Sequence, residues 1–217
     1  MSPRPLVLFD FDGVIADSFT TALHVAQMMC VHITEDSYLK SFEENVHDWW
    51  EREIEQAKHG PECKHDIDWF GEFVPLFEKQ VIPFAGMESV IHELSKKYLL
   101  IVISSTITSP IQGFLEKYHL GRYFSEILGS DIHTKKTEKI QIVFDKYAVS
   151  AKDCVFITDS LGDMREATEK NVDAIGVTWG WHNREVLERG KPFRIVDTPK
   201  DITLAIDDYF AQNHVSP

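Results

Sequence analysis

The sequence predicts an α/β protein, a doubly wound parallel sheet with a helical insertion after the first strand. Short runs of consecutive apolar residues have the length of strands that are covered on both faces. Segments with the apolar spacing of amphipathic helices lie between these runs. One long stretch near the amino terminus has helical patterns only, so it interrupts the alternation. The 217 residues suffice for one domain that carries a modest insertion.

Each predicted strand is an unbroken apolar run, without the alternation that a solvent-facing strand shows. The runs are Leu6–Phe9, Leu99–Ile103, Cys154–Ile157 and Ala174–Val177. Amphipathic helices are predicted between them, because apolar residues recur at intervals of three and four. These apolar sets are Met87, Val90, Ile91 and Leu94, then Ile111, Phe114, Leu115 and Tyr118, and then Ile140, Val143, Phe144 and Tyr147.

The insertion lacks β-branched runs and is predicted to be helical. One helical face comprises Phe42, Val46, Trp49, Trp50 and Ile54, and another comprises Phe70, Phe73, Val74 and Phe77. The turn-forming residues His59-Gly60-Pro61 separate the two faces. We therefore expect an α/β core of residues 1–15 and 83–217 and a helical cap domain of residues 16–82.

The composition excludes several classes of protein. A formal net charge of −13 argues against general binding to nucleic acid or to an anionic membrane, since both need basic surface. No apolar stretch approaches the roughly 20 residues that span a bilayer, and no secretory signal is recognisable. Cys30, Cys63 and Cys154 are few and widely spaced, so we expect no disulfide framework and a cytoplasmic location. The oligomeric state is left open.

Polar side chains follow the predicted strands where ligands bind in open α/β sheets, beyond the carboxyl ends. Asp10 and Asp12 follow the first strand, and Ser104 and Ser105 follow the second. Asp159 and Asp163 follow the strand that starts at Cys154, and Lys136 begins the preceding helix. Carboxylates that converge in this way repel each other, and a divalent cation with a preference for hard oxygen ligands, Mg²⁺, relieves that repulsion. A phosphoryl group is the expected ligand of such a site.

These residues resemble the four motifs of the haloacid-dehalogenase-like hydrolase superfamily. The motifs correspond to Asp10-Phe11-Asp12-Gly13-Val14, Ser104, Lys136, and Thr158-Asp159 followed by Gly162-Asp163. The resemblance covers essentially the whole chain and implies a Rossmann-like core of that superfamily with a cap of the C1 type. Gly176 to Gly180 is similar to the phosphoglycolate-phosphatase-like branch. Val14 departs from the pattern, since many members have Thr there.

The resemblance also implies roles for the site residues. Asp10 corresponds to the nucleophile that forms an aspartyl-phosphate, and Asp12 to the general acid and base. Ser104, Ser105 and Lys136 correspond to phosphate-binding residues, with Lys135 and Lys139 as alternatives to Lys136. Asp10, Asp12, Asp159 and Asp163 correspond to the ligands of Mg²⁺.

The expected activity is Mg²⁺-dependent hydrolysis of a small phosphorylated metabolite. An acid at Asp12 favours phosphoryl transfer over dehalogenation, because a halide leaving group needs no proton. Two alternatives stay open: a phosphomutase that returns the phosphoryl group to its substrate, and a non-catalytic relative that only binds. The residues do not identify the substrate, and they do not show which cap residues select it.

Overall fold

The computed structural model describes residues 4–55, 62–64 and 68–213. Its core is a six-stranded parallel sheet with the strand order β3-β2-β1-β4-β5-β6. The strands are β1 (Leu6–Phe9), β2 (Leu99–Ile103), β3 (Phe124–Leu128), β4 (Cys154–Thr158), β5 (Asp173–Val177) and β6 (Arg194–Val196). The predicted doubly wound α/β class is confirmed. Sequence inspection assigned no residues to β3 or β6, because half-exposed residues such as Glu126 and Arg194 break their apolar runs.

Helices cover both faces of the sheet. Alternate residues of β1 point to opposite sides: Val7 and Phe9 pack in the larger apolar cluster, and Leu6 and Leu8 in the other. The core helices are α5 (Met87–Ser95), α6 (Thr108–Lys117), α7 (Lys136–Tyr147), α8 (Leu161–Glu169), α9 (Arg184–Glu188) and α10 (Pro199–Asn213). Apolar residues of α5, α6 and α10 belong to the larger cluster, and those of α7 to the other. Short 3₁₀ helices cover Gly121–Tyr123 and Ala151–Asp153.

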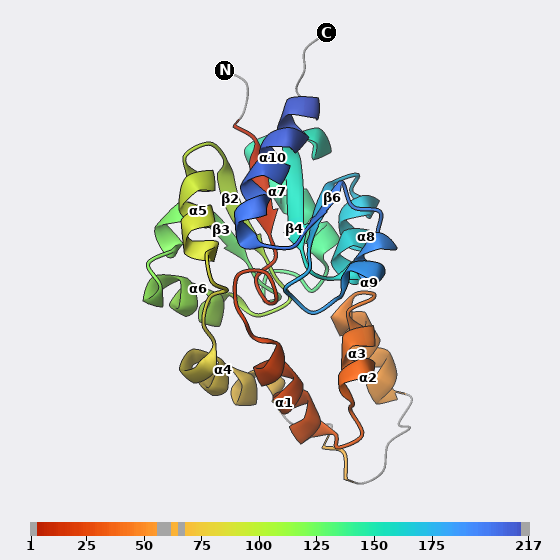
Figure 1. Ribbon diagram of the computed structural model, residues 1–217. Helices are drawn as coiled ribbons and strands as arrows, with labels where there is room; N and C mark the ends of the chain where they lie inside the picture. The colour runs from red at the N-terminus through yellow and green to blue at the C-terminus, as the bar shows by residue number, and fades with distance from the viewer. Residues whose placement is uncertain (1–3, 56–61, 65–67, 214–217) are drawn as a thin grey trace.

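The insertion after β1 is helical, as the sequence predicts. It contains α1 (Phe19–Met29), α2 (Glu35–Ser41), α3 (Val46–Glu55) and α4 (Trp69–Gln80). Figure 1 shows these four helices beyond the carboxyl end of β1, on the side of the core opposite to the end of α10. Phe42 is not part of the helix expected to include it, because the chain turns between α2 and α3. The predicted break at His59-Gly60-Pro61 lies outside the described residues.

The chain leaves the core and returns to it along two hydrogen-bonded segments. The amide of Asp17 donates to the carbonyl of Ile82, and the amide of Phe84 donates to the carbonyl of Ile15, at 2.9 and 3.0 Å. Ala16 and Pro83 form an antiparallel bridge at the same place. These paired segments fix where the insertion is anchored. None of the helices in the described part of the chain has the length and hydropathy of a membrane span.

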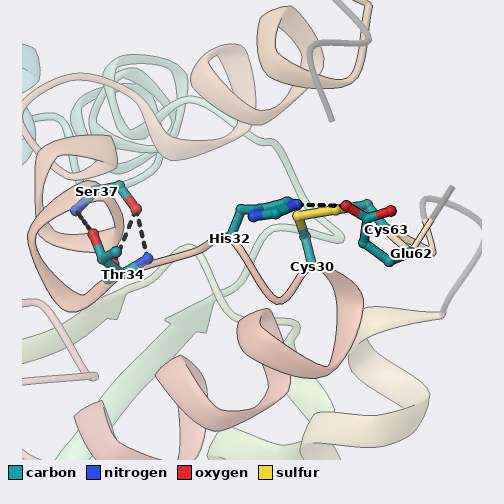
Figure 2. Close-up of a disulfide and its surroundings, with 6 residues drawn as sticks. All are labelled: Cys30, His32, Thr34, Ser37, Glu62 and Cys63. Atoms are coloured by element: carbon teal, nitrogen blue, oxygen red, sulfur yellow. Dashed lines mark hydrogen bonds and ion pairs between the residues drawn. A yellow bond between two sulfur atoms is a disulfide. The ribbon is translucent and has the colours of Figure 1, made fainter. Parts of the chain in front are cut away.

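The structure differs from the expectation of no disulfide framework. Cys30 and Cys63 form a disulfide, which joins the end of α1 to the segment before α4 (Figure 2). Beside it, His32 Nε2 lies 2.6 Å from Glu62 Oε1. Sequence spacing gave no indication of this pair, because 33 positions separate its members. Cys154 is a free, buried thiol.

This disulfide makes a direct prediction about thiol content. Protein purified without reductant and then denatured should react with one equivalent of a thiol reagent, from Cys154, and with three after reduction. Cys30→Ser should lower the free energy of unfolding by about 2–4 kcal/mol, because the open loop gains conformational freedom in the unfolded state. Cys63→Ser serves as the matched variant and should lose the same amount. Three reactive thiols before reduction would contradict the pairing.

Candidate active site

The sheet brings the predicted site residues to one edge. β1 lies between β2 and β4, with Phe9 paired to Val102 on one side and to Ile157 on the other. The loops that follow these three strands therefore emerge together. The polar and charged residues that line the resulting cavity on the core side are Asp10, Asp12, Ser105, Thr106, Lys136, Asp159, Ser160 and Asp163. Acids that lie about 150 positions apart in the chain thus share one cavity.

Lys136 lies between two of these acids. Its Nζ is 2.7 Å from Asp10 Oδ1 and 2.6 Å from Asp163 Oδ2, and it lies 5.4 Å from the centre of the Phe156 ring. The side chain is almost fully buried. The backbone amide of Lys136 donates to Glu166 Oε1 at 2.8 Å, which fixes the start of α7. Lys136 is therefore a buried counter-ion rather than a solvated charge.

The two neighbouring lysines lie elsewhere. Lys135 is half-exposed and its Nζ is 3.3 Å from Asp48 Oδ2. Lys139 is buried and donates to the backbone carbonyl of Ser104 at 2.6 Å. Burial, and then the charge of Lys136, lower the pKa of Lys139 to about 7. Of the three lysines that the sequence left as candidates, Lys136 alone lines the cavity.

The charges around Lys136 are strongly coupled. Burial, and then the negative charge of Asp163, raise the pKa of Asp10 well above its usual range. Burial would also raise the pKa of Asp163, but the charge of Lys136 together with hydrogen bonds from Asp10, Lys136 and Thr158 outweighs it and lowers that pKa. Burial disfavours the ammonium of Lys136, yet Asp10 and Asp163 raise its pKa above the ordinary value. Asp163 and Lys136 are therefore an ion pair, whereas burial and the neighbouring charge of Asp163 disfavour the charged form of Asp10.

Asp12 is held by two hydroxyl groups. Ser18 Oγ donates to Asp12 Oδ1 at 2.6 Å, and Thr106 Oγ1 donates to Asp12 Oδ2 at 2.7 Å. Burial raises the pKa of Asp12 even though these hydrogen bonds stabilise its charged form. A carboxyl group that is oriented and has a raised pKa is suited to donate a proton near neutral pH. Sequence inspection missed both hydroxyls, because Ser18 and Thr106 belong to no motif.

The turn between Asp12 and the insertion requires glycine. Gly13 has φ +75°, and a Cβ atom there would lie 1.9 Å from Asp159 Oδ2. At Gly13 the backbone therefore lies so close to Asp159 that no residue with a Cβ atom would fit.

Asp159 and Asp163 are not helix caps. Ser160 is the N-cap of α8, and its Oγ accepts the amide of Asp163 at 3.3 Å. The Asp163 side chain instead accepts a hydrogen bond from Thr158 Oγ1 at 2.8 Å and forms an ion pair with Lys136. Asp159 Oδ2 accepts the amide of Trp181 at 2.7 Å, and burial raises the pKa of Asp159 to about 7. Both carboxylates are thus held in place while they face the cavity.

The two predicted serines occupy different positions. Ser105 lines the cavity, together with Thr106. Ser104 is fully buried behind it, and its Oγ accepts the amide of Thr106 at 3.0 Å. Neither serine is the N-cap of α6, which is Ile107. Ser104 thus shapes the loop that presents Ser105 and Thr106.

The donor set of the site fits a hard divalent cation. In the described part of the chain, no group of three or more His, Cys, Asp or Glu side chains is already gathered as a metal site. Asp10 and Asp159 are nevertheless buried acids with raised pKa values, and Lys136 is the one ammonium among the described cavity residues. Carboxylate oxygens are the ligands that Mg²⁺ prefers, and a bound cation would favour the charged forms of both acids.

The insertion supplies the opposite wall of the cavity, which is largely aromatic. The aromatic residues that line it are Tyr38, Phe42, Trp50, Trp69, Phe70 and Phe73, and Trp181 of the core completes the wall. His47 lines it as well. Arg52, also in the insertion, pairs with Glu44 at the surface. His182 is buried and bridges core and insertion through the carbonyl of Leu39, 3.0 Å from its Nε2.

Comparisons with known proteins agree with this arrangement. A family model described as haloacid dehalogenase-like hydrolase matches residues 7–177. The phosphoglycolate phosphatase of Synechococcus elongatus is 24% identical over 217 residues, which cover 95% of this chain and 99% of the relative. A protein of Dickeya dadantii described as "probable phosphatase IndB" is 27% identical over 217 residues, 92% of each chain. A predicted phosphatase from Clostridium acetobutylicum has the same fold, with a TM-score of 0.79 at 20% identity over 95% of this chain and 100% of that chain.

The position of Lys136 predicts a large difference between two adjacent substitutions. Lys136→Met should destabilise the metal-free protein by about 3–5 kcal/mol, because it leaves Asp10 and Asp163 buried together without a counter-ion. Lys135→Met should change stability by less than about 0.5 kcal/mol, because its side chain is exposed. Urea denaturation monitored by circular dichroism measures both values. Equal losses would contradict the placement of Lys136.

Proposed function

The chain belongs to the haloacid dehalogenase-like hydrolase family, and we propose that it is a Mg²⁺-dependent phosphatase that hydrolyses a small phosphorylated metabolite through an aspartyl-phosphate. One observation carries this proposal: Asp10, Asp12 and Lys136 meet in a single cavity at the end of β1. Relatives named as phosphatases that cover nearly the whole chain support the same reaction class.

Asp10 is the proposed nucleophile. Its Oδ1 is held by Lys136 Nζ and by the amide of Phe11, 2.8 Å away. The other oxygen, Oδ2, attacks phosphorus, and the bond from phosphorus to the leaving oxygen breaks. Lys136 and the loop of Ser104 and Ser105 stabilise the negative charge on the transferring phosphoryl oxygens.

Asp12 is the proposed general acid and base. In the first step its carboxyl group gives a proton to the leaving alcohol. In the second step the resulting carboxylate takes a proton from the water that attacks phosphorus, which releases inorganic phosphate and restores Asp10. The hydroxyls of Ser18 and Thr106 hold Asp12 in one orientation for both transfers.

The proposed metal ligands are the side chains of Asp10, Asp159 and Asp163 and the backbone carbonyl of Asp12. Bound Mg²⁺ supplies positive charge that shields an anionic nucleophile from an anionic substrate. The insertion, residues 16–82, is the proposed cap domain over the core of residues 1–15 and 83–217. Its aromatic wall limits the access of water to the carboxylates.

The nucleophile can be tested with one substitution. Asp10→Asn should reduce phosphate release from acetyl phosphate in the presence of Mg²⁺ by at least about 10³-fold, because an amide oxygen does not replace the carboxylate nucleophile. The variant should fold normally, since it removes a buried charge. Chelation of Mg²⁺ from the unmodified protein should also stop phosphate release, and addition of Mg²⁺ should restore it. Activity of Asp10→Asn near that of the unmodified enzyme would refute the proposal.

The acid role of Asp12 predicts a dependence on the leaving group. Asp12→Asn should slow hydrolysis of alkyl phosphates by about 10²–10⁴-fold, because their alkoxides need a proton as they leave. Hydrolysis of acetyl phosphate should be slowed less in the first step, since its leaving group is a weak base. Rapid-quench measurement of the first turnover separates the two steps, and equal losses for both substrates would remove the acid role. Conversion of a sugar phosphate into an isomer without phosphate release would identify a mutase instead.

A further inference from the structure

The cavity extends well beyond the carboxylates. Its volume is about 260 Å³, whereas about 10–15 Å³ accommodates one water molecule. A phosphoryl group bound at Asp10 and Lys136 would fill only part of this volume. The remainder lies against the insertion and must therefore receive the organic part of the substrate.

The wall around this remainder is aromatic, and its rings pack on one another. Trp181 contacts Phe42 edge-on with ring centres 4.3 Å apart, and its ring is 6.0 Å from that of Tyr38. Trp69 stacks on Phe73 at 4.4 Å. These rings are held by one another, so they offer a preformed apolar surface.

In the described lining of this region, no charged side chain is available to pair with a second anion. Among the described residues that line the cavity, Lys136 is the only lysine or arginine, and it already lies between Asp10 and Asp163. His47 is the one further basic residue of this described lining. Its burial, and then the charge of Lys139, lower the pKa of His47, so its ring is neutral at pH 7. A carboxylate placed against the insertion would be buried without a counter-ion.

Two polar atoms in this region have no hydrogen-bond partner in the described structure. They are His47 Nε2 and Trp181 Nε1, and both are buried. Buried polar atoms are rarely left unpaired in native proteins. Because both side chains line the cavity, a neutral polar atom of a ligand can satisfy them. This pair indicates a binding surface rather than a surface that merely packs.

We propose that the substrate is the phosphate monoester of an uncharged, largely apolar alcohol with an aromatic ring, bound with the ring against the aromatic wall of the insertion. This inference rests on the phosphatase function proposed above and adds the class of the leaving group. It distinguishes this chain from phosphoglycolate phosphatases as a class, because phosphoglycolate carries a second negative charge next to its phosphate.

A panel of four phosphates tests the substrate class in the presence of Mg²⁺. The three monoesters 2-phenylethyl phosphate, ethyl phosphate and phosphoglycolate have aliphatic alkoxide leaving groups, so differences among them report mainly on binding. We expect kcat/KM for 2-phenylethyl phosphate to exceed that for ethyl phosphate by about 30- to 100-fold, as burial of a phenyl group implies. Phosphoglycolate should be no better than ethyl phosphate. A preference for phosphoglycolate would overturn the inference.

Acetyl phosphate separates failure of this inference from failure of the proposed function. It is small and activated, so its hydrolysis requires the carboxylates but little of the aromatic wall. Hydrolysis of acetyl phosphate together with a preference for phosphoglycolate would overturn the substrate class alone. No hydrolysis of any of the four phosphates would overturn the phosphatase proposal and the inference with it.

Substitutions in α4 test the aromatic wall directly. Phe70 and Leu76 are both half-buried in this helix, but only Phe70 lines the cavity. Phe70→Ala should reduce the ratio of kcat/KM for 2-phenylethyl phosphate over ethyl phosphate by about fivefold or more. The matched variant Leu76→Ala should leave this ratio unchanged.

A second position provides the same test if Phe70→Ala fails to fold. Trp50 lines the cavity from α3, and Trp50→Ala should reduce the same ratio. Trp50→Arg should in addition raise kcat/KM for phosphoglycolate, since it places a cation where the described wall has none. An unchanged ratio in both Phe70→Ala and Trp50→Ala would overturn the inference, as would equal reductions in Phe70→Ala and Leu76→Ala.

Discussion

The contact of Lys136 with Asp10 and Asp163 is the interaction on which the rest of the site depends. It joins the end of β1, the start of α7 and the first turn of α8 at distances of 2.6 and 2.7 Å. Burial makes these charges costly, and the geometry compensates for that cost only while Lys136 lies against the acids. A site of this kind is held ready before any ligand arrives, so it need not reorganise when charge develops on a transferring group.

The topology of the sheet explains why this contact can form. β1 is central, with β2 and β4 as its parallel neighbours, so three loops distant in sequence open at the same edge. The insertion starts from one of these loops, and its helices line the same cavity. The charged and the apolar surfaces of the cavity thus come from two parts of the chain: strand ends hold the charges, and the helices of the insertion provide the apolar wall.

The strand ends could be predicted from the sequence, because an apolar run followed by Asp10 or Asp159 indicates the end of a buried strand from neighbouring residues alone. The partners that orient these acids could not, since Thr106 reaches Asp12 only through the fold. Helical periodicity placed Trp49 and Trp50 together on one apolar face, but only Trp50 lines the cavity. The disulfide could not be predicted either, because the spacing of Cys30 and Cys63 does not indicate that α1 lies next to the segment before α4.

The central claim is that the acids at the ends of β1 and β4 act on one phosphoryl group. A crystal structure with Mg²⁺ and orthovanadate, an analogue of a transferring phosphoryl group, tests it most directly. We expect vanadium next to the free oxygen of Asp10, a vanadate oxygen in contact with Lys136 Nζ, and one cation that touches both Asp10 and Asp159. Vanadate bound away from Asp10, or a cation that contacts only one of these two acids, would contradict the account.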